Sequence, residues 1–221
     1  MPLSLADRLA RRVFVLNGAA AGDDAAGFLA ALDGGRIVGE RHIPGRGAAE
    51  RFAPLARDIL READWPSGPD AIVAVVGPGS FTGLRASLSL AAGLAAGYGC
   101  PAVGVSLGAA FRAMPDAADA VCINVARRNR CFVDWGDGRV EAYAPSEIVL
   151  PPGRRLLAGD AVDWLGEDQR AGRVVLPYRH PAPTAILAAA MSDPRPVAQP
   201  LYVDAPEAKP PQGGLRPAPV G

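Results

Sequence analysis

The stretch AIVAVVGPGSFTGLR, from Ala71 to Arg85, runs from a strand pattern through a glycine-rich turn into a helix pattern. The apolar run from Ile72 to Val76 is typical of a buried strand, and we expect the following helix to begin near Thr82. A strand that delivers a glycine-rich turn to a helix N-terminus presents backbone N–H groups and the positive end of the helix dipole to an anion. The stretch therefore predicts a strand–turn–helix unit whose turn is a candidate phosphate-binding site.

The spacing of the glycines matches neither common phosphate-binding motif. A P-loop carries Lys and then Ser or Thr after its last glycine, whereas Leu84 and Arg85 follow Gly83 here. A dinucleotide-binding motif would place the last glycine one residue earlier, and a nucleophile elbow would need a glycine on both sides of Ser80 at a spacing of two. The pattern favours a tight turn that lets strand and helix pack closely, with Ser80 or Thr82 as the helix N-cap. The candidate turn comprises Gly77, Pro78, Gly79, Ser80, Thr82 and Gly83.

Ordered landmarks across residues 45–210 resemble the TsaB (YeaZ) family. They are GPGSFTGLR at 77–85, GL at 93–94, GCPAVGVS at 99–106, GRGAAERFAPL at 45–55, ARR at 126–128, LAGD at 157–160 and PLYVDAPEAKP at 200–210. The chain departs from the family pattern at Ala48, where a histidine is usual. The resemblance implies a bacterial accessory protein for making threonylcarbamoyladenosine at position 37 of tRNAs that read ANN codons. It also implies an actin/Hsp70-like (ASKHA) two-lobed α/β fold.

The order of predicted elements agrees with such a fold. Strands are expected at 13–16, 25–32, 36–42, 72–76 and 102–106, with helices at 49–64 and 83–97. A looser second set comprises strands at 120–125, 131–135, 140–143, 155–158 and 174–176 and a helix at 182–191. We therefore expect a first lobe at 1–106, a reduced second lobe at 107–198, and a proline-rich tail without regular structure at 199–221.

Composition narrows the classes of function and compartment. Acidic and basic residues balance at 23 each, so charge makes no case for nucleic-acid binding by the chain alone. The irregularly spaced Cys100, Cys122 and Cys131 predict buried apolar filler and no disulfide framework. No apolar run approaches the roughly 20 residues needed to span a bilayer. We expect a cytoplasmic protein with no membrane partner.

The sequence offers few catalytic or metal-binding candidates. The resembled fold places an acidic residue at the end of the first strand of each lobe, and the matching positions here are Asn17 and Val125. An amide is a poor magnesium ligand and a valine is none. His42 and His180 cannot form the helical pair that carries the metal of TsaD, the family's catalytic relative. We therefore expect no catalytic or metal site, with ATP and metal held by the partner.

The second predicted helix carries no charge from Ala86 to Gly97 and is rich in Ala, Ser and Gly, which predicts burial on more than one face. The resemblance implies that the two helices of the first lobe dock against a TsaD-type catalytic subunit or a second copy of the chain. A TsaE-type ATPase would join the wider complex, and tRNA would be contacted only indirectly. The expected partner interface comprises Phe52, Leu55, Ile59, Arg85, Ser89, Gly93, Gly97, Leu201 and Tyr202.

Alternatives remain open from the sequence. The chain could be an enzyme, either a nucleotide hydrolase that uses the glycine turn or a peptidase of the glycoprotease type, or a homodimer with no role toward TsaD. The segment containing Leu201 and Tyr202 holds enough apolar surface to dock but too little to fold alone. It would lie either on a partner or in an apolar groove of the chain's own first lobe.

Overall fold

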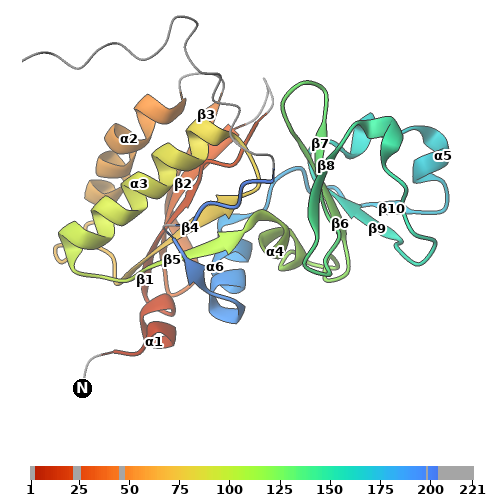
Figure 1. Ribbon diagram of the computed structural model, residues 1–221. Coiled ribbons are helices and arrows are strands. Elements are labelled where there is room, and N and C mark those ends of the chain that lie inside the picture. The colour runs from red at the N-terminus through yellow and green to blue at the C-terminus, as the bar shows by residue number, and fades with distance from the viewer. Residues whose placement is uncertain (1–2, 22–25, 45–47, 198, 204–221) are drawn as a thin grey trace, which may run out of the picture.

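A computed structural model describes residues 3–21, 26–44, 48–197 and 199–203, and these form two lobes, each built on its own β-sheet (Figure 1). The first sheet has the strand order β11-β5-β4-β1-β2-β3. Its strands are β1 (Arg12–Asn17), β2 (Ala26–Asp33), β3 (Arg36–Pro44), β4 (Ala71–Gly77), β5 (Ala102–Ser106) and β11 (Arg195–Pro196). Strands β1, β2 and β3 form an antiparallel meander, whereas β1, β4 and β5 run parallel.

Helices cover both faces of the first sheet, which buries its central strands β1, β4 and β5 (Figure 1). One face carries α2 (Ala48–Glu62) and α3 (Phe81–Tyr98), and the other carries α4 (Leu107–Arg112) and α6 (Pro183–Ser192). Every residue of β4 is buried, as its continuous apolar run predicts for a strand covered on both faces. A short N-terminal helix, α1 (Leu5–Leu9), begins with a capping box between Ser4 and Asp7 and packs on α6 and β1.

The second lobe is smaller and has its own core (Figure 1). Its strand order is β10-β9-β6-β7-β8. The strands are β6 (Val121–Val125), β7 (Cys131–Asp134), β8 (Val140–Tyr143), β9 (Leu156–Ala158) and β10 (Val174–Val175). Short 3-10 helices at Pro145–Glu147 and Val162–Trp164 and the helix α5 (Glu167–Arg170) complete it. The α/β class and the reduced second lobe are therefore confirmed, and most elements lie within two or three residues of their predicted bounds.

The end of the described chain returns to the first lobe, which differs from the expected boundary at residue 198. Helix α6 packs on α4 and the first sheet, and β11 pairs antiparallel with β5. The physical reason is that α6 is apolar nearly all round and must be buried on more than one side. Its buried residues are Pro183, Ala185, Ile186, Leu187, Ala189 and Ala190. Strand β11 also adds a strand at Arg195–Pro196, where none was predicted.

Two of the predicted segments, the first-helix motif and the proline-rich tail, lie partly outside the described residues. Residues 45–47 of the first-helix motif and 204–221 of the tail lie outside the described residues. In the part of the chain that the structure describes, no helix is both long enough and apolar enough to cross a membrane.

Candidate functional site

The glycine turn is shaped for close packing against the segment that follows β1. Ser80 caps α3, because its Oγ accepts a hydrogen bond from the Gly83 N–H at 3.3 Å. A Cβ on Gly79 would overlap the backbone of Ala19, and one on Gly83 would overlap the Gly18 carbonyl oxygen. The Ser80 N–H donates to the Ala19 carbonyl at 2.8 Å. Of the two interpretations of this turn, the structure supports tight packing with Ser80 as the N-cap.

The turn also forms one wall of a cleft between the lobes. The carboxyl ends of β1 and β4 and of β6 and β9 border it, and Leu107 and Phe111 of α4 also line it. The lining residues are Asn17, Ala19, Ala20, Ala21, Pro78, Gly79, Leu107, Phe111, Asn124, Val125, Asp160 and His180. The free space amounts to about 10 Å³, roughly the volume of one water molecule. A nucleotide-sized ligand needs several hundred Å³, so this arrangement of the lobes leaves no room for one.

The structure places the two expected acid positions at this cleft. Asn17 is buried, and its Oδ1 accepts a hydrogen bond from the Ala19 N–H at 3.0 Å, which stabilises the close approach of the segment after β1. Val125 lies at the end of β6. Sequence reasoning missed the role of Asp160, which was noted only as the end of a motif. Its Oδ1 accepts a hydrogen bond from the Val125 N–H at 2.8 Å, so a carboxylate does occupy the second-lobe side of the cleft.

Among the described residues that line the cleft, Asp160 supplies the one carboxylate. Burial raises its pKa, although the hydrogen bond from Val125 and the nearby His180 oppose that shift. Among the described residues, no group of three or more His, Cys, Asp or Glu side chains is placed to hold a metal ion. His42 lies on edge strand β3, with its Nε2 3.0 Å from a carboxylate oxygen of Glu40.

The residues of the expected partner interface differ in how deeply they are buried. Phe52 and Ile59 are buried in the first-lobe core, at 2% and 0% exposure, so they offer no surface to a partner in this structure. Those two assignments are therefore corrected; the apolar stripe of α2 holds the helix onto its own sheet. Leu55 is half-buried.

On α3 the expected residues do reach the surface. Ser89, Gly93 and Gly97 are exposed, and a Cβ at either glycine would meet no atom within 4 Å. Because α2 and α3 pack side by side, this flat strip of small residues lies on the outer surface of a helix pair.

The segment after β11 lies on the chain's own first lobe. The Leu201 N–H donates to the Val76 carbonyl at 2.8 Å, and the Leu201 side chain packs against the core. The ring of Tyr202 lies 5.3 Å from that of Phe81, and its hydroxyl accepts a hydrogen bond from Arg85 Nε at 3.1 Å. Arg85 also stacks over the Phe81 ring at 3.9 Å. Of the two alternatives for Leu201 and Tyr202, the structure supports the groove on the chain's own lobe.

The cysteines behave as filler. Cys122 and Cys131 are buried and free of disulfides, and burial raises their pKa to about 12 and about 11, respectively.

Comparisons with known proteins agree with this architecture. Residues 42–144 match the family model described as TsaD, tRNA N6-adenosine threonylcarbamoyltransferase. Uncharacterized protein Rv3421c of Mycobacterium tuberculosis and uncharacterized protein Mb3455c of Mycobacterium bovis are each 30% identical over 181 residues, covering 79% of this chain and 83% of the relative.

Two crystal structures from Pseudomonas aeruginosa share the fold. YeaZ superposes with a TM-score of 0.66 at 23% identity, covering 87% of this chain and 99% of that chain. An uncharacterized protein with similarity to peptidase YEAZ gives a TM-score of 0.67 at 22% identity, covering 88% and 100%.

The two sheets, the cleft between them and the glycine turn define a two-lobed α/β protein of the ASKHA-like class. Within that class the glycine-turn motif separates this chain from phosphate-binding loops, and its relatives cover most of its length. The chain belongs to the TsaB (YeaZ) family, which serves tRNA modification.

Proposed function

We propose that this chain is a non-catalytic scaffold that binds a TsaD-type catalytic subunit and supports transfer of threonylcarbamoyl to adenosine 37 of tRNA. The catalytic subunit would hold ATP and metal, a TsaE-type ATPase would join the wider complex, and tRNA would be contacted mainly through the partner. The complex would act in the cytoplasm.

The observation that carries this proposal is the outer face of α3. An exposed strip that includes Ser89, Gly93 and Gly97 lets the backbone of another helix approach closely, because no side chain larger than a hydroxymethyl group stands between these positions on the strip. Buried apolar residues hold the same helix rigidly on its own sheet. A rigid helix with a flat face suits docking against a second helix with little loss of conformational entropy.

The cleft between the lobes supports a non-catalytic role. Its free space is enough for about one water molecule, and the described residues that line it include a single carboxylate. The chain would then act by binding one conformation of the catalytic subunit more tightly than the others, which shifts the population of that subunit toward its active form.

Gly93→Arg tests the proposed face. The variant should stay folded, because arginine is a better helix former than glycine and the position is open. It should bind the catalytic subunit at least about tenfold more weakly, because a long charged side chain holds the helices apart. Isothermal titration calorimetry measures the affinity, and a melting curve checks the fold. The control is Ala188→Arg, an exposed position on α6 across the sheet, which should bind as the unmodified chain does.

The other candidate functions give different results in the same assays. A folded Gly93→Arg protein that binds at the original affinity would reject the α3 face. Turnover of ATP or of a peptide by the isolated chain, lost in Asp160→Asn, would favour the enzyme. A chain that is dimeric alone and ignores the catalytic subunit would favour the stand-alone homodimer.

A further inference from the structure

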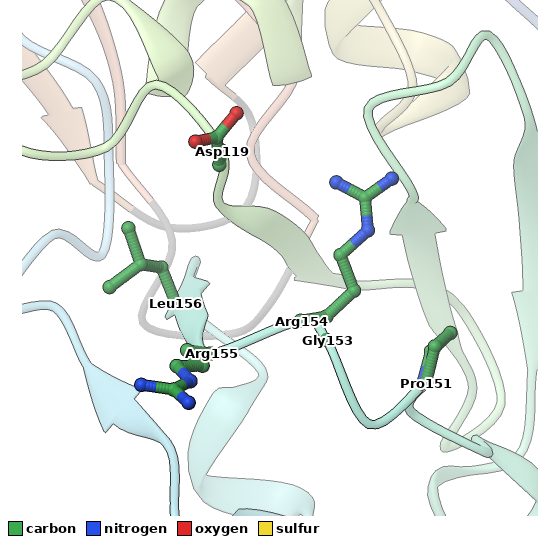
Figure 2. A pocket seen from close by; sticks show the side chains of 6 residues that line it. All are labelled: Asp119, Pro151, Gly153, Arg154, Arg155 and Leu156. Atoms are coloured by element: carbon green, nitrogen blue, oxygen red, sulfur yellow. The ribbon is translucent and has the colours of Figure 1, made fainter.

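A second hollow lies on the second lobe, away from the cleft and from α3. Two loops form it, one between α4 and β6 and one before β9, and its volume is about 550 Å³. Its lining residues are Asp119, Pro151, Gly153, Arg154, Arg155 and Leu156. In Figure 2 the Arg154 guanidinium and the Asp119 carboxylate extend toward the same side of the hollow, while Arg155 extends in the opposite direction. A space of this size accommodates a ligand as large as a nucleotide.

The loop at 150–155 is held in shape before any ligand arrives. The guanidinium of Arg173 donates to the carbonyl oxygens of Leu150 at 3.0 Å and Arg154 at 3.1 Å, and also to that of Gln169 at 2.9 Å. A further hydrogen bond within the loop joins the Arg154 N–H to the Pro151 carbonyl at 3.1 Å. These bonds fix the backbone of the loop while leaving the side chains of Arg154 and Arg155 to point outward, so little backbone freedom remains to be lost on binding.

Charged side chains in this hollow have no counterion among the described residues. In the part of the chain that the structure describes, Arg154, Arg155 and Asp119 make no hydrogen bond or ion pair through their side chains. A third guanidinium, that of Arg112, lies nearby. Both it and the Arg154 guanidinium border Gly136, because a Cβ built on that glycine would lie 3.6 Å from Arg112 Nη1 and 3.8 Å from Arg154 Nη1. Asp134 is already paired with Arg112 at 3.0 Å, so its carboxylate does not serve as a counterion for Arg154.

We propose that this hollow binds the ribose phosphate of a nucleotide. The phosphate pairs with Arg154, with Arg155 adding positive potential at the rim, since a planar guanidinium matches phosphate oxygens with two parallel hydrogen bonds. Asp119 would repel a bare anion, but a carboxylate accepts hydrogen bonds from sugar hydroxyls, which places the ribose beside it. The assignment stands apart from the proposed scaffold role, because it uses neither α3 nor a partner subunit.

Three variants test the site, with nuclear magnetic resonance titrations of the full chain by adenosine 5′-monophosphate and by inorganic phosphate. Arg154→Gln should weaken binding of both probes by about tenfold, the loss expected for charge-assisted hydrogen bonds. The matched control is Arg36→Gln, which removes an exposed arginine from the first lobe and should leave both affinities unchanged. Asp119→Ala should weaken binding of the nucleotide and tighten binding of inorganic phosphate, because it removes the hydroxyl acceptor together with the repulsion. Melting curves check that each variant is folded.

A single-stranded oligoribonucleotide distinguishes the two sources of this ligand. If RNA is the source, the oligonucleotide binds more tightly than the monophosphate, and its affinity falls with salt at a slope of about −1.4 for two phosphate contacts. If a free nucleotide is the source, both bind alike. The proposal is overturned if neither probe binds the unmodified chain, if Arg154→Gln and Arg36→Gln behave alike, or if Asp119→Ala shifts both affinities in the same direction.

Discussion

At the scale of single residues, the glycines of the turn serve the packing of two backbones. Gly79 and Gly83 face Ala19 and Gly18, and a Cβ at either position in the turn would overlap backbone atoms. Backbone atoms cannot move aside by changing rotamer, as a side chain can, so there is no easy way to make space for the added Cβ. The sequence motif therefore records a contact between two distant segments of the chain.

Gly83→Ala should lower the free energy of unfolding by about 2 kcal/mol or more, because the added methyl group forces backbone apart in a packed region. Gly93→Ala in the same helix should raise it by up to about 1 kcal/mol, since that position is open and alanine is the better helix former. Urea denaturation of both variants measures the difference. Equal effects at the two positions would show that Gly83 is not in tight contact.

The sequence predicted part of this arrangement. The spacing of Gly77, Gly79 and Gly83 argued against both phosphate-binding motifs, and Ser80 was one of two proposed caps. The contacting segment at 18–19 could not be predicted, because it is distant in sequence and depends on β1 and β4 lying side by side in the sheet. Asp160 was likewise overlooked at the cleft, because the expectation was tied to the end of β6 and the carboxylate comes from the end of β9.

At the scale of elements, residues 199–203 form a strap across the start of α3. Leu201 is hydrogen bonded to Val76 and packs on the core, and its carbonyl oxygen lies 2.8 Å from the site of a Cβ on Gly77. Tyr202 and Phe81 are in contact through their rings. The strap therefore connects the end of β4 with the first turn of α3, the helix that carries the proposed partner face.

Truncation after Gln199 should lower the stability of the isolated chain by about 2 kcal/mol, because it removes a half-buried leucine and an aromatic contact. Truncation after Val203 is the matched control, since it keeps the strap and should leave stability within about 0.5 kcal/mol. Thermal or urea unfolding gives the comparison. If both truncated chains melt with the full chain, the strap contributes nothing to the fold and its contacts belong to a complex.

Periodicity located most elements but not all of their neighbours. Phe52 and Ile59 were predicted to face a partner, yet an apolar stripe on α2 fits its own sheet equally well, and the sheet is what covers them. For α6 the difficulty was greater, because a helix that is apolar on nearly every side indicates burial without indicating against what. Its place beside α4 follows only from the three-dimensional arrangement of the first lobe.

At the scale of the whole molecule, an ion pair connects the two lobes. Arg112 at the end of α4 pairs with Asp134 of β7 at 3.0 Å, and Asp134 also accepts a hydrogen bond from the Gly136 N–H at 3.0 Å. Asp134 is 4% exposed, so its buried carboxylate needs the Arg112 guanidinium as a counterion, and the partly buried guanidinium needs the carboxylate. The first lobe, through α4, is thus held against the hairpin of the second.

Asp134→Ala should destabilise the protein by about 3 kcal/mol, because it leaves the partly buried Arg112 charge without its counterion. Asp163→Ala removes the partner of Arg179 in a pair whose side chains are both 59% exposed, and it should cost less than about 1 kcal/mol. Urea denaturation separates the two. A loss of similar size in both variants would mean that the interlobe pair is no stronger than a surface one.

The return of α6 and β11 to the first sheet bears on how the chain is made. Residues are synthesised in order, and β11 pairs with β5 only after about 90 further residues have emerged from the ribosome. Until then the face of the first sheet that α6 covers stays open to water, whereas the second lobe emerges as one uninterrupted stretch and can fold first. The half of the protein that begins earliest is therefore the half that is completed last.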